Sequence, residues 1–167
     1  MGFTSIESIK TAGFTGFKTV EELRNNKSLI PKEQGVYLIL NLKKPTFLET
    51  GTGGFFKGKN PNAEIETLEE NWIENAPVIY IGKAISLYKR LGQYFHFGEG
   101  KNVGHWGGRF IWQLENSKDL VVCWKTTEEE ARIEEINLIQ KFVKQYGKRP
   151  FAKLIFLFFN YYTIAGF

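Results

Sequence analysis

The stretch VIYIGKAISLYKRLGQYF, residues 78–95, changes its pattern halfway along. It begins with β-branched and aromatic residues that favour a buried strand, and it passes through Gly82 into leucines and tyrosines at helical spacing. Ser86 is a suitable N-cap for the helical part. The stretch therefore predicts a strand that is followed closely by a basic helix, and the rest of the chain is placed around this unit.

The composition of the 167 residues predicts one compact domain. Apolar residues make up 43% of the chain and aromatic residues 16%, which is ample material for a hydrophobic core. The net charge is +4, and the segment from Lys83 to Arg109 is basic, with Glu99 as its one acidic residue. A concentrated positive charge of this kind favours an anionic partner such as nucleic acid.

Cysteine and histidine are scarce in this chain. Cys123 is the only cysteine, and its place in the run LVVCW predicts a buried small side chain. With His96 and His105 as the only histidines, a zinc site of the Cys/His kind cannot be assembled. The first ten residues contain no long apolar segment of the secretory type. We therefore expect a cytoplasmic protein with no membrane partner.

The patterns divide the chain into three parts. Residues 1–34 predict a helical N-terminal extension in which Thr19 caps a helix, and residues 35–152 predict the main domain. Residues 153–167 form an apolar, strongly aromatic tail. The tail is too short for a membrane anchor, which needs ~20 apolar residues. It is interpreted either as a terminal strand or helix of the core or as a non-native, out-of-frame extension.

Within the main domain, residues 35–42 and 120–124 predict two further buried strands. Residues 43–77 form an insertion with glycine-rich loop segments and an acidic helix. Thr127 begins a capping box for the last helix, which Gly147 ends. The chain is thus predicted to fold as a small α/β domain, with a central three-stranded antiparallel or mixed sheet flanked by helices.

Glu135 interrupts the apolar face of the last helix. It lies four residues before Ile139, which with Phe142, Val143 and Tyr146 forms the apolar stripe of that helix. A buried carboxylate without a partner is costly. Glu135 is therefore either a carboxylate at the edge of the stripe, or a ligand for a hard cation or an acid/base group.

Further candidates come from the strands and the basic helix. Arg90 is predicted to border the buried side of that helix, whereas Lys89 points away from it. Tyr37 and Tyr80 belong to two strands that are expected to pair, and each is either a core aromatic or a reactive phenol. A phenol is a weak base at neutral pH unless a cation such as Lys83 stabilises its ionised form.

At these positions the chain resembles the GIY-YIG nuclease superfamily. GVY at 35–37 and YIG at 80–82 are similar to its two signatures, Arg90 follows the second glycine by eight residues, and Glu135 matches the metal-binding glutamate. The segment GKAISLYKRLGQYF is most similar to the incision protein of bacterial nucleotide excision repair, whereas HWGGRFIWQL and YGKRPFA are similar to standalone bacterial members. The resemblance covers about residues 35–152.

The resemblance implies an endonuclease that hydrolyses DNA phosphodiester bonds with one divalent cation, Mg²⁺ or Mn²⁺, on Glu135. Arg90 would stabilise the transition state, and Tyr80 assisted by Lys83, or else Tyr37, would take a proton from the attacking water. His105 is either a second proton shuttle or a plain hydrogen-bonding side chain. Five residues are expected to contact DNA: Lys89, Tyr94, Lys101, His105 and Arg109. Cleavage of both strands would require a homodimer or two encounters.

Two departures from the family pattern leave alternatives open. The two signatures are separated by residues 38–79, far more than is usual, and this insertion is expected to shape substrate access. Lys153 follows RPFA, where the family tends to have asparagine. This lysine favours the alternative of a catalytically inactive nucleic-acid-binding module with the same fold. A component of a defence or restriction system is a third reading, which keeps the chemistry.

Overall fold

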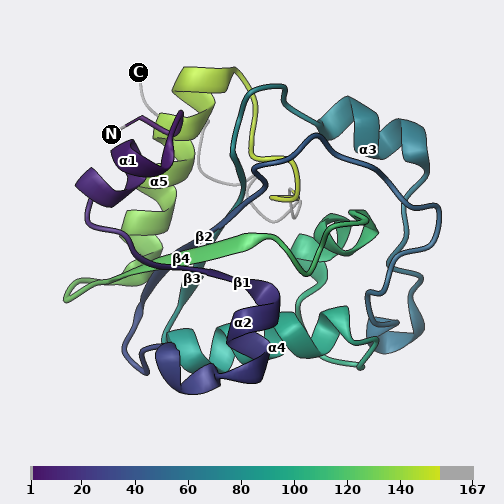
Figure 1. Ribbon diagram of the computed structural model, residues 1–167, viewed down its shortest axis with the longest axis horizontal. Coiled ribbons are helices and arrows are strands. Elements are labelled where there is room, and N and C mark those ends of the chain that lie inside the picture. Colours follow the sequence, from purple (N-terminus) through teal and green to yellow (C-terminus); the bar gives the residue numbers. More distant parts are fainter. Residues whose placement is uncertain (1, 155–167) are drawn as a thin grey trace, which may run out of the picture.

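The computed structural model describes residues 2–154. The fold has three layers, in which a four-stranded antiparallel sheet lies between two groups of helices (Figure 1). The strands are β1 (Thr15–Thr19), β2 (Gly35–Leu40), β3 (Val78–Ala84) and β4 (Val121–Thr126). The α-helices are α1 (Ile6–Thr11), α2 (Val20–Asn25), α3 (Ile65–Asn71), α4 (Leu87–Gly98) and α5 (Ala131–Tyr146). Three 3₁₀ segments are η1 (Lys27–Leu29), η2 (Phe56–Gly58) and η3 (Trp106–Gln113). The predicted α/β class is confirmed.

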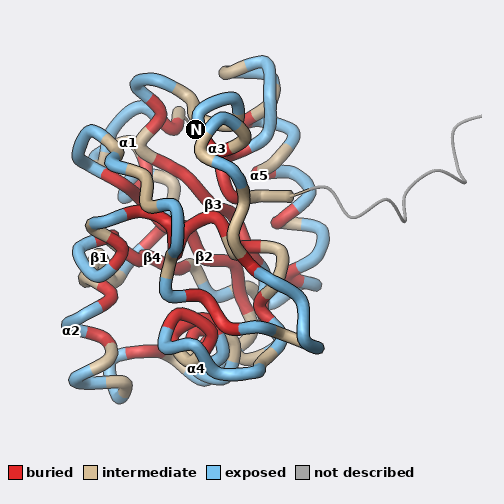
Figure 2. The backbone as a smooth tube through the Cα atoms, turned by 90° about the vertical axis from the view of Figure 1, so that its right-hand side faces the viewer, coloured by how far each residue is buried: buried red, intermediate tan, exposed pale blue. Residues whose placement is uncertain are grey.

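Strand β2 is buried along its whole length, because helices cover both faces of the sheet (Figure 2). Val36, Leu38 and Leu40 pack in the cluster that includes residues of α1 and α5. Tyr37 and Ile39 point to the opposite face and pack against residues of α2, α4 and η3. The strand order is β1-β4-β2-β3, so β3 lies at one edge of the sheet.

The strand-to-helix unit predicted from residues 78–95 is confirmed. β3 pairs antiparallel with β2, and two residues after it the Ser86 side chain caps α4 by accepting a hydrogen bond from the backbone N–H of Lys89 at 3.5 Å. The helix buries Leu87, Leu91, Tyr94 and Phe95 against the sheet. Two elements that carry most of the predicted site are therefore joined by a short, capped turn.

The N-terminal segment 1–34 was expected to be helical, but it also contributes strand β1 to the sheet. β1 pairs antiparallel with β4 and adds a fourth strand to the predicted three. Its ladder is irregular between Thr15 and Lys18, and Phe17 has a φ of 50°. The side chains of β1 therefore do not alternate regularly between the two faces of the sheet. The capping box at Thr19, which begins α2, is confirmed.

Helix α5 begins later than expected. Its N-cap is Glu130, and no side chain caps it, so the capping box predicted at Thr127 is wrong. The backbone N–H of Thr127 instead donates to the Gln34 carbonyl at 3.1 Å, which extends the pairing of β4 with β2. The helix ends at Gly147 in the left-handed conformation, with φ 77°, as predicted.

The insertion at 43–77 packs along the face of the domain that holds α4 and η3. Phe47 forms an isolated bridge with Leu114, and the N–H of Gly54 donates to the Phe97 carbonyl at 2.8 Å. Tail residues 155–167 lie outside the described part of the chain, so both interpretations of the tail remain predictions. Across residues 2–154, no helix has both the length and the apolar character to cross a membrane.

Gly82 on β3 leaves space for the side chain of Tyr37 on the neighbouring strand β2. It pairs directly with Tyr37 across the two strands, and the Tyr37 ring lies over it. A Cβ atom at Gly82 would lie 2.6 Å from the Tyr37 hydroxyl oxygen and would overlap the ring carbons. The glycine is therefore required by the position of the Tyr37 side chain.

We expect Gly82→Ala to lower the free energy of unfolding by ~1–3 kcal/mol, because the added methyl group overpacks the Tyr37 ring. Gly92→Ala in α4 is the matched control, since nothing lies within 4 Å of a Cβ at that position. Alanine there should be neutral or stabilising by up to ~1 kcal/mol. Urea unfolding of both variants measures the difference, and equal midpoints would contradict the packing described for Tyr37.

Candidate active site

A cleft of about 870 Å³ lies against the edge strand β3 and collects side chains from distant parts of the chain. Four of the five predicted catalytic residues line it: Tyr80, Lys83, Arg90 and Glu135. They come from β3, α4 and α5. The fifth, Tyr37, does not line the cleft and is completely buried on β2.

Strand alternation and helix position bring these groups together. Tyr80 and Lys83 are separated by three positions on β3, so they point to opposite faces of the sheet. Lys83 reaches α5, where its Nζ lies 2.9 Å from Oε2 of Glu135. Tyr80 packs in the cluster on the other face, with α4. The cleft can receive both side chains because β3 has no strand on its outer side.

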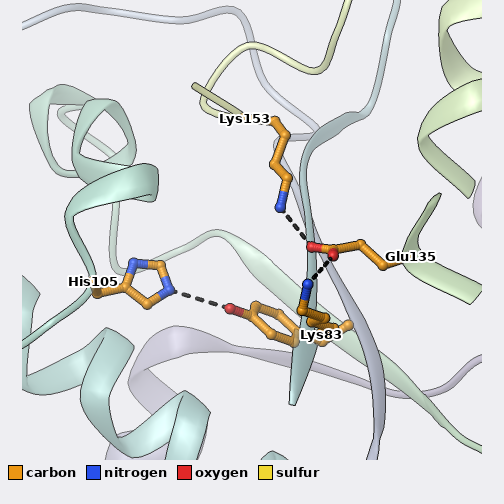
Figure 3. Close-up of polar contacts among 5 residues, drawn as sticks. Lys83, His105, Glu135 and Lys153 are labelled. Carbon is orange, nitrogen blue, oxygen red and sulfur yellow. Dashed lines mark hydrogen bonds and ion pairs between the residues drawn. The ribbon is translucent and has the colours of Figure 1, made fainter. Parts of the chain in front are cut away.

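Glu135 lies between two lysines (Figure 3). The Nζ of Lys153 donates to Oε1 at 2.6 Å, and Lys83 donates to Oε2. Burial raises the pKa of the Glu135 carboxyl, but the charges and hydrogen bonds of Lys153 and Lys83 outweigh it, and the net pKa is below its ordinary value. The carboxylate is therefore ionised at neutral pH, and its two ammonium partners leave the group with a net positive charge.

Lys153 is held in place by the chain around it. The backbone N–H of Ala152 donates to the Ile79 carbonyl on β3 at 2.9 Å, and Phe151 packs against Trp72 with ring centroids 5.2 Å apart. The Lys153 ammonium also lies 5.2 Å from the centroid of the Tyr80 ring, within cation–π distance. The position for which the family resemblance implied asparagine thus supplies a cation to the site.

The donor set around Glu135 does not fit a resident divalent cation. Mg²⁺ can be held by one or two carboxylates together with water and phosphate oxygens, but both oxygens of the one carboxylate here accept from ammonium groups. Within residues 2–154, no group of three or more His, Cys, Asp or Glu side chains could hold a metal ion. The expected Mg²⁺ or Mn²⁺ on Glu135 remains a prediction from resemblance, and the arrangement of charges argues against it.

The two tyrosines lie at different depths. Tyr80 lines the cleft, whereas Tyr37 does not line it and is completely buried. The Tyr37 hydroxyl is hydrogen-bonded to Nε2 of His105 at 3.2 Å, the contact drawn at His105 in Figure 3. Burial, followed by the neighbouring Tyr80, raises the pKa of Tyr37. Burial also raises the pKa of Tyr80, but the Arg90 guanidinium partly offsets this effect. Of the two phenols, Tyr80 is the one that can meet a ligand in the cleft.

Arg90 is oriented by contacts on two sides. Its Nη1 donates to the Gly104 carbonyl at 2.8 Å and to Oε1 of Gln93 at 3.0 Å. Gln93 lies one turn further along α4, and Gly104 lies in the loop before η3. These contacts hold the guanidinium at the wall of the cleft, where it can present its remaining N–H groups to an anion.

The five residues expected to contact DNA are not gathered at the cleft, and none of them lines it. His105 and Tyr94 are completely buried, which corrects the prediction that either side chain touches DNA. Burial and the charges of Arg90 and Lys153 lower the pKa of His105 to about 3, so its imidazole is neutral.

The other three expected contacts lie nearer the surface. Lys89 is exposed on α4. Lys101 pairs with Glu99 at 3.0 Å. The guanidinium of Arg109 lies over the Trp106 ring at 4.7 Å. Their contact with DNA remains a prediction.

The cationic residues that do line the cleft were largely missed by sequence reasoning. Besides Lys83 and Arg90, the lining contains Lys57, Lys59, Arg132, Arg149 and Lys153. Among the described residues of the lining, Glu135 is the one carboxylate. A usable signal existed only for Arg132, which lies three positions before Glu135 and thus on the same side of α5. The other four come from the insertion and from the segment after α5.

Comparisons with known proteins provide one match. The chain is 34% identical over 74 residues to UvrABC system protein C of Nautilia profundicola, a segment that covers 44% of this chain. The chain spans only 12% of the length of that relative. No family model matches the chain, and no solved structure matches it. The similarity is therefore a coarse, partial link to a component of the UvrABC system.

Proposed function

We propose that this chain is an endonuclease that hydrolyses phosphodiester bonds of DNA in the cleft beside β3. The observation that carries the proposal is the charge of the lining, where seven lysine and arginine side chains surround one carboxylate. Phosphate groups are the anions that such a concentration of cations favours. The similarity to UvrABC system protein C supports a nuclease in general terms. The hydrolysis of phosphodiester bonds is inferred from the GIY-YIG-like motifs.

In this proposal Arg90 and Lys83 hold the phosphate that is cleaved. The planar guanidinium of Arg90 can donate two parallel hydrogen bonds to the non-bridging oxygens, which a lysine ammonium cannot do. Lys83 has a half-exposed side chain, and only one of its three N–H donors is needed for Glu135. Together the two groups would stabilise the negative charge that develops as water attacks phosphorus.

Tyr80 is the proposed proton acceptor. As the water oxygen bonds to phosphorus and the bond to the departing sugar oxygen breaks, one water proton passes to the phenolate oxygen of ionised Tyr80. An ammonium group of the cleft protonates the departing oxygen. Burial keeps the net pKa of Tyr80 above its ordinary value and the Arg90 charge offsets this in part, so the ionised form that accepts the proton is the minor form at neutral pH. Tyr37 and the neutral His105 lie underneath and fix the Tyr80 ring, whose centroid is 5.8 Å from that of Tyr37.

A second candidate function is a nucleic-acid-binding module without turnover. The ion pair between Lys153 and Glu135 favours it, because this pair removes the free carboxylate that the family resemblance assigns to a metal. Both candidates predict DNA binding, and only the first predicts strand breaks. Incubation of purified protein with supercoiled plasmid and with flapped duplexes, in EDTA and in Mg²⁺, separates them. Nicking supports the nuclease, and binding without nicking supports the module.

Arg90→Ala should lower the rate of plasmid nicking by ~10²-fold or more, because one preorganised charge stabiliser of the transition state is lost. DNA affinity should fall much less, since other cations of the cleft remain. Lys141→Ala, an exposed lysine of α5 that does not line the cleft, is the control and should cut like the unmodified protein. Equal nicking rates for all three proteins would remove Arg90 from the mechanism.

The double variant Lys57→Ala/Lys59→Ala should reduce the salt dependence of DNA binding. Each lysine that neutralises one phosphate contributes about 0.9 to the slope of log K against log salt concentration, so the slope should fall by ~2. Lys141→Ala/Lys144→Ala removes the same charge from an exposed part of α5 and should leave the slope unchanged. Fluorescence anisotropy over a salt series measures both, and identical slopes would place the DNA path elsewhere.

A further inference from the structure

The contact between Lys153 and Glu135 is built into the fold. The side chains are 18% and 8% exposed, and the atoms Nζ and Oε1 are 2.6 Å apart. Residues 150–154 lie along β3, to which Ala152 is hydrogen-bonded. Phe151, two residues before Lys153, is part of the core. The backbone that carries Lys153 is therefore fixed beside β3, within reach of Glu135.

Lys153 supplies the positive charge that a bound cation would bring to this group. Glu135 and Lys83 together carry no net charge, and the Lys153 ammonium brings the sum to +1. Each ammonium keeps donors for a further acceptor after it has bonded to Glu135. A phosphate that enters the cleft thus meets a net positive charge, together with directed N–H donors in place of coordination positions.

We propose that the Lys153 ammonium takes the place of a divalent cation beside Glu135, so that the cleft binds a phosphodiester without metal. This inference rests on the proposed function in taking DNA phosphate as the ligand. A cation that approached Glu135 would have to displace Lys153 and would be repelled by Lys83 and Arg90. Lys153 is then a residue that determines the metal requirement of the site.

The variant Lys153→Asn tests the proposal, because asparagine offers a neutral oxygen and frees Oε1 of Glu135. Mn²⁺ binding, measured by electron paramagnetic resonance, should be at least ~10-fold tighter in this variant than in the unmodified protein. The added change Glu135→Gln should abolish the gain. Lys125→Asn is the matched control, since it breaks the Lys125–Glu134 pair of 3.1 Å outside the cleft, and it should gain no Mn²⁺.

DNA binding provides a second measurement. In EDTA, Lys153→Asn should bind a labelled duplex about 10-fold more weakly, because one charge-assisted contact to phosphate is lost. Mn²⁺ should restore this affinity in the variant and have no effect on the unmodified protein. Lys153→Arg keeps the positive charge and should behave like the unmodified protein in both measurements. Circular dichroism confirms folding, and Lys153→Ala replaces the asparagine variant if the latter unfolds.

Two results would overturn the inference: Mn²⁺ binding by the unmodified protein as tight as by Lys153→Asn, or DNA binding by the unmodified protein that needs metal. Failure of the proposed nuclease would look different. In that case no variant would nick plasmid in EDTA or in Mn²⁺, while the gain of Mn²⁺ binding by Lys153→Asn would still be observed.

Discussion

The antiparallel pairing of β2 with β3, with the Tyr37 ring lying over Gly82, is the constraint on which the rest of the site depends. This register places Tyr80 opposite Ile39 and directs Tyr80 and Lys83 to different faces of one edge strand. A slip of one residue would exchange those faces and turn Lys83 into the core. The positions of Tyr80 and Lys83 on β3 therefore depend on a packing contact between a ring and a residue without a side chain.

An edge strand is normally a liability, because its free backbone groups can pair with another chain. Here the outer side of β3 carries the cleft, and the segment after α5 covers part of it through the bond from Ala152 to Ile79. The same segment delivers Lys153 to Glu135. Protection of the edge and completion of the charge cluster are thus two effects of one short piece of chain.

The sequence was sufficient to predict the elements that depend on local signals. The capped turn at Ser86 and the helix end at Gly147 follow from side-chain capping and from glycine's access to positive φ, and both are present. Strand β1 was missed because its bulge removes the alternation on which strand prediction depends. The capping box at Thr127 failed because that residue's backbone pairs with Gln34 across the sheet.

For the site, four predicted residues meet at the cleft because their spacing on strands and helices fixed their directions. The cations at 57, 59, 149 and 153 could not be assigned, because only tertiary packing brings the insertion and the chain after α5 to β3. The burial of His105 could not be predicted either, because its segment is rich in glycine and tryptophan and has the composition of a loop. Local patterns thus placed four residues of the candidate site, and long-range contacts determined its electrostatic surroundings.

The Lys153–Glu135 contact also has a consequence for how such a site can change in evolution. Lysine and asparagine codons share their first two bases, so one substitution at the third base exchanges the two residues. If one ammonium group determines whether Glu135 is available to metal, a single nucleotide separates two modes of phosphate recognition on one unaltered scaffold. Dependence on metal availability could then be acquired or lost without passing through an unfolded or rearranged intermediate sequence.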